Sequence, residues 1–239
     1  MANSATHSDG PDYVIFIPGM LCDERLFEGM TDGLQVAHHV ASVSGAATIA
    51  DIAERILAEA PPRFAVVGLS MGGIVAMHLW RIAPDRLSHM MLLNTTPDAD
   101  APGGGATALA HIAAQMAGGE GHSIVDTIHK LYLGSNASES DVLPELMISM
   151  AQSVGIEALG VQALALASRA DSNELLPTIS IPTTIVCGDQ DKLCSEAGHQ
   201  KMAAAIPGSW LVVIEGCGHM SAIEEPGVVA DEMLALFAR

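Results

Sequence analysis

Residues 62–80 read PRFAVVGLSMGGIVAMHLW, and the fold can be inferred outward from this stretch. The apolar run at residues 64–67 is typical of a short buried strand, and residues 74–80 have the spacing of a packed helix. Ser70 therefore lies on a sharp turn between strand and helix, within the GLSMGG sequence of residues 68–73. Glycines on both sides let the two backbone segments pass closely and relieve a turn conformation in which larger side chains would clash. The pattern predicts a nucleophile elbow, which lifts a serine hydroxyl into a site.

A serine hydroxyl is a weak nucleophile until a base takes its proton, so the chain must also supply a histidine and an acid that orients it. His219 lies in the glycine-flanked sequence CGHM, shortly after the apolar stretch WLVVI, which is typical of a strand. Upstream, TTIVC at residues 183–187 predicts another strand, and the sequence GDQD follows it. Either aspartate of this sequence, Asp189 or Asp191, could in principle reach His219. The order along the chain is Ser70, then an aspartate, then His219.

Near the N-terminus, a further strand pattern, DYVIFI, runs into the sequence PGM of residues 18–20. The segments IPGMLCDERLF, GLSMGG, CGDQDKLC and CGHM together resemble the α/β-hydrolase superfamily, and in particular its small single-domain bacterial hydrolases and esterases. The order serine, aspartate, histidine is also that of this superfamily. The resemblance extends over residues 13–237. It is specific for the fold and the triad and weak for the substrate.

The resemblance implies roles for individual residues. Members usually carry His-Gly before the oxyanion-hole residue, and here Pro18 replaces the histidine while the glycine remains. The backbone N–H groups of Met20 and Met71 are therefore expected to stabilise a developing oxyanion. The acid is usually the aspartate of Gly-x-x-Asp, which in this sequence is Asp191. Asp189 is expected instead to form a turn, its side chain accepting hydrogen bonds from nearby backbone N–H groups.

Strand and helix patterns alternate along most of the chain, which predicts an α/β fold with a mostly parallel sheet and helices on both faces. Strands are expected at residues 14–17, 39–43, 64–67, 89–93, 183–187 and 211–214, and helices at residues 49–59, 71–82, 196–205 and 228–237. We expect residues 11–96 and 177–239 to form an α/β-hydrolase core, and the polar residues 1–10 to form a disordered tail.

The alternation breaks down in residues 97–176, which are rich in Ala, Met and Leu and have helical periodicity. In the superfamily, an insertion after the strand that follows the elbow covers the nucleophile, so this segment is predicted to be a helical lid. A packed helical layer without ligand contact is the alternative. The inward faces are expected to be apolar, and their methionines to adapt to varied substrates. Candidate pocket residues are Met116, Leu131, Tyr132, Met147, Met150 and Leu164 in the lid, and Leu21 and Met220 outside it.

Composition excludes several classes of protein. The chain has 28 Asp and Glu against 10 Lys and Arg, a formal net charge of −18, so nucleic acid and anionic membrane surfaces should repel it. Salt adaptation and base-composition bias both remain open as reasons for the acidic excess. No apolar run is long enough to span a membrane, and the N-terminus lacks the basic and apolar segments of a signal peptide. A cytoplasmic location is therefore expected, and no particular oligomeric state is predicted.

The cysteines and histidines do not have the spacing of a metal site. The four cysteines form no C-x-x-C pair and are expected to be buried free thiols. The ten histidines are scattered, and the adjacent His38 and His39 are not spaced for joint ligation. No metal is predicted.

The motifs together predict a serine hydrolase of the carboxylesterase type, which cleaves a small apolar ester through an acyl-enzyme without a cofactor. The same triad serves lactone opening, C–C bond hydrolysis of diketones and perhydrolysis, so these alternatives stay open. A serine at the elbow argues against the dehalogenase branch of the superfamily, which uses an aspartate there. A non-catalytic ligand receptor on this fold is disfavoured, because such a receptor commonly tolerates loss of one triad member and all three are present.

Overall fold

The computed structural model describes residues 10–116, 131–137, 140–155 and 157–239, without the side chains of residues 111–116. The predicted tail therefore lies outside the described residues, except for Gly10. Six described strands form one sheet in the order β2-β1-β3-β4-β5-β6, and every neighbouring pair is parallel. The strands are β1 (Tyr13–Ile17), β2 (Ala37–Val40), β3 (Phe64–Leu69), β4 (Leu87–Leu93), β5 (Thr183–Gly188) and β6 (Trp210–Ile214).

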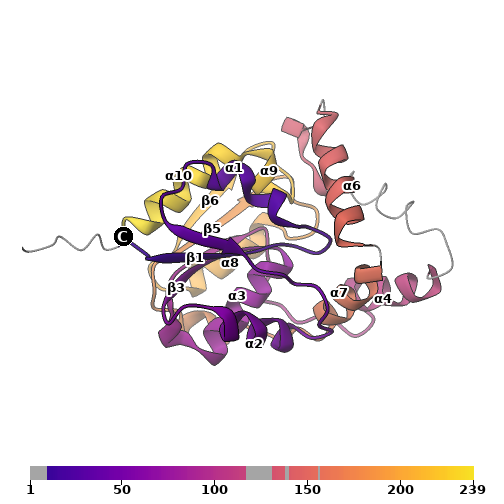
Figure 1. The fold of residues 1–239 in the computed structure, drawn as a ribbon, viewed down its shortest axis with the longest axis horizontal. Coiled ribbons are helices and arrows are strands. Elements are labelled where there is room, and N and C mark those ends of the chain that lie inside the picture. Colours follow the sequence, from indigo (N-terminus) through magenta and orange to yellow (C-terminus); the bar gives the residue numbers. More distant parts are fainter. Residues whose placement is uncertain (1–9, 117–130, 138–139, 156) are drawn as a thin grey trace, which may run out of the picture.

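Helices cover both faces of the sheet, which confirms the predicted α/β architecture (Figure 1). One face carries α2 (Ile49–Glu59), α3 (Met71–Ile82) and α8 (Glu196–Ala205), and the other carries α1 (Glu28–Thr31), α9 (Ser221–Glu224) and α10 (Pro226–Phe237). Alternate side chains of a strand enter the two resulting cores, so that Val66 packs on the α3 face and Val67 on the α10 face. Burial on both faces explains why the central strands read as continuous apolar runs.

The second strand was predicted at residues 39–43 but is formed by Ala37–Val40. Its register pairs Tyr13 with Ala37 and Phe16 with Val40, and the chain leaves the sheet after that pair. Ala41 and Val43 are buried, yet they belong to the core of the α2 and α3 face as part of the loop that leads into α2. Apolar residues at every second position of this loop have the same pattern as a half-buried strand. The strand was therefore predicted too far toward the C-terminus.

The turn at Ser70 joins β3 directly to α3. Ser70 has φ 54° and ψ −113°, a left-handed conformation that is rare for residues other than glycine. Its N–H donates a hydrogen bond to Leu93 O at 2.9 Å, which anchors the turn to the end of β4. A Cβ atom on Gly72 would overlap the carbonyl of Ile17, so only glycine lets the end of β1 approach the first turn of α3. This approach brings the segment after β1 next to Ser70.

Residues 97–176 contain the helices α4 (Gly105–Met116), α6 (Val142–Val154) and α7 (Glu157–Ala167), together with the short η3 (Ser135–Ala137), and η4 (Leu176–Thr178) follows at their end. Figure 1 shows α4, α6 and α7 at one end of the sheet. α4 packs against α7. Ala151 of α6 and Leu159 of α7 form a small apolar cluster with Leu21, which follows β1. These helices therefore lie at the end of the sheet where β1 ends.

Two side chains that were expected to face inward from this segment do not. Leu131 is 48% exposed and Leu164 is 52% exposed. Both expectations were therefore wrong. α7 is built almost entirely from alanine, leucine and other small or apolar residues, so its sequence does not mark which face is covered.

No single described helix is long and apolar enough to cross a membrane. α6 and α7 reach that length and composition only when taken together, and they meet at an angle of 91°.

Candidate active site

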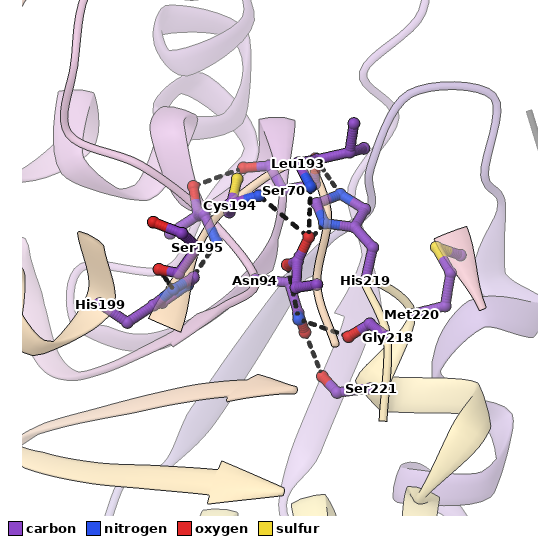
Figure 2. Close-up of polar contacts among 12 residues, drawn as sticks. Ser70, Asn94, Leu193, Cys194, Ser195, His199, Gly218, His219, Met220 and Ser221 are labelled. Atoms are coloured by element: carbon purple, nitrogen blue, oxygen red, sulfur yellow. Dashed lines mark hydrogen bonds and ion pairs between the residues drawn. The ribbon is translucent and has the colours of Figure 1, made fainter. Parts of the chain in front are cut away.

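Three polar side chains from the carboxyl ends of three strands form a continuous hydrogen-bonded chain (Figure 2). Ser70 follows β3, Asp191 follows β5 and His219 follows β6. Ser70 Oγ lies 3.0 Å from His219 Nε2, and His219 Nδ1 lies 2.9 Å from Asp191 Oδ2. The fold thus brings together the serine, aspartate and histidine singled out in the sequence, although Ser70 and His219 are 149 positions apart.

The carboxylate of Asp191 is buried and fully hydrogen bonded. Oδ1 accepts from the backbone N–H groups of Leu193 and Cys194 at 2.8 and 2.9 Å, and Oδ2 accepts from Asn94 Nδ2 at 3.0 Å as well as from His219. Burial by itself would raise the pKa of Asp191, but the hydrogen bonds and the nearby imidazole outweigh it and lower the pKa to about 2. Asp191 is therefore negatively charged at neutral pH.

A charged Asp191 determines which nitrogen of His219 carries the proton. The carboxylate accepts the Nδ1–H, which leaves Nε2 as the acceptor for the Ser70 hydroxyl. The imidazole is 2% exposed, and the Tyr132 ring packs edge-on against it with the ring centres 5.2 Å apart. The backbone N–H of His219 also donates to Tyr132 O at 2.6 Å. The ring is thus oriented so that it can take the proton of Ser70 and hold it.

The other candidate acid, Asp189, points elsewhere. Its Oδ1 accepts a hydrogen bond from Gly216 N–H at 2.8 Å, which joins the segments that follow β5 and β6. Among the described residues, it makes no hydrogen bond or ion pair with His219. Its role in this structure is to tie two loops together.

Two backbone N–H groups close to Ser70 are the candidates for an oxyanion hole. Met71 is the first residue of α3, where backbone donors have no partner within the helix and the helix dipole is positive. Met20 lies in the turn that follows β1, and the backbone just before this turn contacts Gly72 in the first turn of α3. Within the described part of the chain, neither N–H donates a hydrogen bond to another residue. Both donors are therefore free to bind a ligand oxygen.

Asn94 was not identified from the sequence as a site residue. Asn94 directly follows β4 and lies at the centre of the polar network (Figure 2). It is fully buried in a left-handed conformation with φ 46°. Its amide donates to Asp191 Oδ2 and to Gly218 O, both at 3.0 Å, and its oxygen accepts from the Ser221 hydroxyl. A polar residue directly after an apolar strand, at the end of the sheet where Ser70 lies, was the signal that could have revealed it.

Thr95 and His199 form hydrogen bonds that stabilise the backbone of the elbow. Thr95 Oγ1 donates to Ser70 O at 2.8 Å, and the N–H of Thr95 donates to His199 Nε2 at 3.1 Å. His199 Nδ1 is 3.0 Å from Ser195 O and therefore carries the ring proton. Burial lowers the pKa of His199, so the ring is neutral in this structural role.

The remaining candidate contact residues are mostly packed side chains. Leu21, Met147, Met150 and Met220 are buried, and Tyr132 is partly buried against the same apolar cluster as the three methionines. Met116 ends α4, and its side chain lies outside the described part of the structure. Among the described candidates, only Tyr132 makes an aromatic or polar contact with a residue of the hydrogen-bonded chain, the ring of His219.

A polar cleft of about 360 Å³ lies beside the site. It is formed by the loop after β4 and the start of α8, and it contains the ion pair of Arg169 with Asp100 at 3.1 Å. Thr95, Leu193 and Cys194 line it, whereas Ser70 does not. The cleft is therefore adjacent to the hydrogen-bonded chain and separate from the serine hydroxyl.

One group of side chains has ligand types suited to a metal. The donor atoms of Asp191, Cys194 and His219 lie within 4.8 Å of one another. Burial and the nearby carboxylate of Asp191 raise the pKa of Cys194 to about 12, so its thiol stays protonated, whereas metal binding needs a thiolate. Asp191 and His219 already bind each other. These residues do not fit a resident metal ion.

Known proteins resemble this chain in sequence and in structure. A pimeloyl-[acyl-carrier protein] methyl ester esterase of Yersinia pseudotuberculosis is 27% identical over 203 residues, which cover 80% of this chain and 75% of that protein. A thermophilic esterase from Thermogutta terrifontis has a TM-score of 0.84 at 24% identity, covering 93% of this chain and 88% of the other. An enol-lactonase from Burkholderia xenovorans has a TM-score of 0.83 at 18% identity, covering 98% and 94%.

At 24% and 18% identity, the similarity to these two solved structures shows that the chain shares their fold and nothing more. The family assignment comes from the sequence profile of the Alpha/beta hydrolase family, which matches residues 16–232 and so spans most of the chain. The matched region begins in β1 and ends in α10, and it includes Ser70, Asp191 and His219. The chain belongs to the Alpha/beta hydrolase family.

Proposed function

We propose that this chain is a carboxylic ester hydrolase that works through a Ser70 acyl-enzyme. The observation that carries the proposal is the hydrogen-bonded chain from Asp191 through His219 to the hydroxyl of Ser70 on the elbow. A serine, a base within hydrogen-bond reach and a buried acid that orients the base are the parts that nucleophilic acyl transfer requires.

In the proposed mechanism, Ser70 Oγ attacks the ester carbonyl while His219 Nε2 takes its proton. The N–H groups of Met20 and Met71 stabilise the oxyanion of the tetrahedral intermediate, and Asp191 stabilises the imidazolium. His219 then protonates the leaving alcohol, and an acyl-enzyme remains on Ser70. A water molecule then attacks the acyl carbonyl while His219 takes its proton. Collapse of the second tetrahedral intermediate releases the carboxylic acid, and His219 returns the proton to Ser70 Oγ.

We propose a small apolar ester as the substrate and residues 97–176 as the lid that covers it. The buried methionines Met147 and Met150 of α6 support an apolar acyl site. The names of the curated relatives support a methyl ester as the bond that is cleaved. A cytoplasmic location fits this role.

The test is a stopped-flow assay with p-nitrophenyl butyrate. When hydrolysis of the acyl-enzyme is slower than its formation, p-nitrophenol is released in a burst close to one equivalent per enzyme, followed by a slower steady rate. A panel of methyl esters, a lactone and a diketone run on the same preparation identifies the preferred bond. No release of p-nitrophenol above the rate in buffer would contradict the proposal and favour a ligand receptor.

The acyl chain preference is predicted to lie at short to medium lengths. A modest apolar site under a helical segment accommodates few methylene groups, and each buried methylene contributes only about 0.8 kcal/mol. We expect kcat/KM to peak at short to medium acyl chains, and charged acyl groups to react poorly. Measurement of kcat/KM across p-nitrophenyl esters of increasing length checks this. A steady rise to long-chain triglycerides, with activation at an oil interface, would show that the expectation is wrong.

Asn94 is predicted to position Asp191 and the His219 loop. Asn94→Gly removes the hydrogen bonds to Asp191 and Gly218 but tolerates the left-handed backbone, so it separates the side chain from backbone strain. We expect kcat to fall by up to about 100-fold with little change in KM, because misplacing catalytic groups affects mainly the transition state. Asn94→Ala adds backbone strain and should also lower the melting temperature. Full activity in Asn94→Gly would rule out the positioning role.

A further inference from the structure

The turn that carries Met20 contains a strained residue. Cys22 N–H donates to Gly19 O at 3.3 Å and closes a four-residue turn. Leu21, the third residue of this turn, has φ 57°, a position at which turns of this kind usually place glycine or asparagine. A leucine in the left-handed region persists only where the surroundings hold it there.

A glutamine that is distant in the sequence but adjacent in the fold holds this residue. Gln162 of α7 accepts a hydrogen bond from Leu21 N–H through Oε1 at 2.9 Å, across 141 positions of the chain. Its amide nitrogen lies 3.4 Å from Ser44 Oγ, in the loop after β2. Gln162 has no exposed surface. A buried glutamine is uncommon, and here both ends of its amide have partners.

Apolar packing surrounds the same contact. Leu21 is 7% exposed and clusters with Ala151 of α6 and Leu159 of α7, with Met20 packed against them. The Leu21 N–H therefore lies in surroundings that exclude water, where a donor without a partner is costly. Gln162 supplies the acceptor that this N–H needs.

We propose that Gln162 is a positioning residue for the oxyanion hole, and this inference rests on the proposed function. The Met20 N–H is one peptide unit before the Leu21 N–H. A rotation of the turn that breaks the bond to Gln162 therefore also redirects the Met20 N–H away from the oxyanion. Through this bond, α7 determines the geometry of a donor that acts mainly in the transition state.

The test is Gln162→Met, which keeps the length and apolar volume of the side chain and removes the acceptor. We expect kcat for a p-nitrophenyl ester to fall by about 10- to 100-fold, with KM within about threefold of wild type. A trifluoromethyl ketone with the same acyl chain forms a hemiketal with Ser70 and places an oxyanion in the hole. Its affinity should fall by the same factor as kcat/KM.

Ser44→Ala is the matched control, because it removes the other hydrogen bond of Gln162 and leaves the Leu21 contact in place. It should retain wild-type kcat and wild-type affinity for the ketone. Gln162→Asn, which shortens the reach of the amide by one methylene, is a second variant if Gln162→Met does not fold, and it should show the same separation of kcat from KM.

Wild-type affinity for the trifluoromethyl ketone in either folded Gln162 variant would overturn the proposal, even if the melting temperature fell. That result would assign Gln162 a role in stability alone. Failure of the proposed function is a different outcome, in which the wild-type protein does not hydrolyse esters or Ser70→Ala remains active. With an active wild type and an inactive Ser70→Ala, a negative result in the Gln162 variants refutes only the positioning role.

Discussion

Ser70→Ala is expected to lower kcat for ester hydrolysis by about 10⁴- to 10⁶-fold. The substitution removes the only atom that would form the acyl-enzyme, the Oγ that lies 3.0 Å from His219 Nε2. The left-handed backbone at Ser70 is as uncommon for alanine as for serine, so folding should be little affected. The measurement is the burst amplitude and steady rate with p-nitrophenyl butyrate, together with a thermal melt.

Ser209→Ala is the matched control for this prediction, because among the described residues the Ser209 hydroxyl donates only to Ala203 O, near the end of α8 and away from the elbow. It should keep the full burst. If Ser70→Ala retained even about a tenth of the wild-type rate, a loss far smaller than a triad nucleophile causes, the assignment of the elbow as the catalytic nucleophile would be wrong.

Asp191→Asn is expected to lower kcat by about 10³- to 10⁴-fold, whereas Asp189→Asn should cost less than about tenfold. The amide keeps the shape of the carboxylate but removes the charge that stabilises the His219 imidazolium. An amide nitrogen facing Nδ1 would also favour the wrong tautomer of the ring, in which Nε2 cannot accept the Ser70 proton. Steady-state kinetics of the two variants at one pH measure the difference.

The two aspartates form a matched pair because both follow β5 and differ in what they contact. Among the described residues, the Asp189 side chain accepts one hydrogen bond, from Gly216 N–H, and an asparagine oxygen can accept the same bond. Asp191 accepts four, one of them from His219. If Asp189→Asn proved the more damaging substitution, the acid would have to be reassigned to Asp189.

Local patterns were sufficient to predict most of the sheet and the elbow. The period of a strand or helix is set by contacts between residues a few positions apart, so it can be read from β3, Ser70 and α3 without knowledge of the rest of the chain. The same signal was misleading where burial came from a loop, as at Ala41 and Val43. It was uninformative where a helix is apolar on all sides, as at Leu164.

The sequence by itself determined the order of Ser70, Asp191 and His219 and the strand ends on which they lie, because parallel strands present their carboxyl ends at one edge of the sheet. Only the tertiary structure decided which polar groups support them. Asn94 reaches Asp191 across 97 positions and Gln162 reaches Leu21 across 141. Within the described parts of the chain, neither side chain has a hydrogen-bond partner nearby in the sequence that would mark it. Their hydrogen bonds exist because the sheet order places β4 beside β5, and because α7 packs on the turn after β1 and excludes water from it.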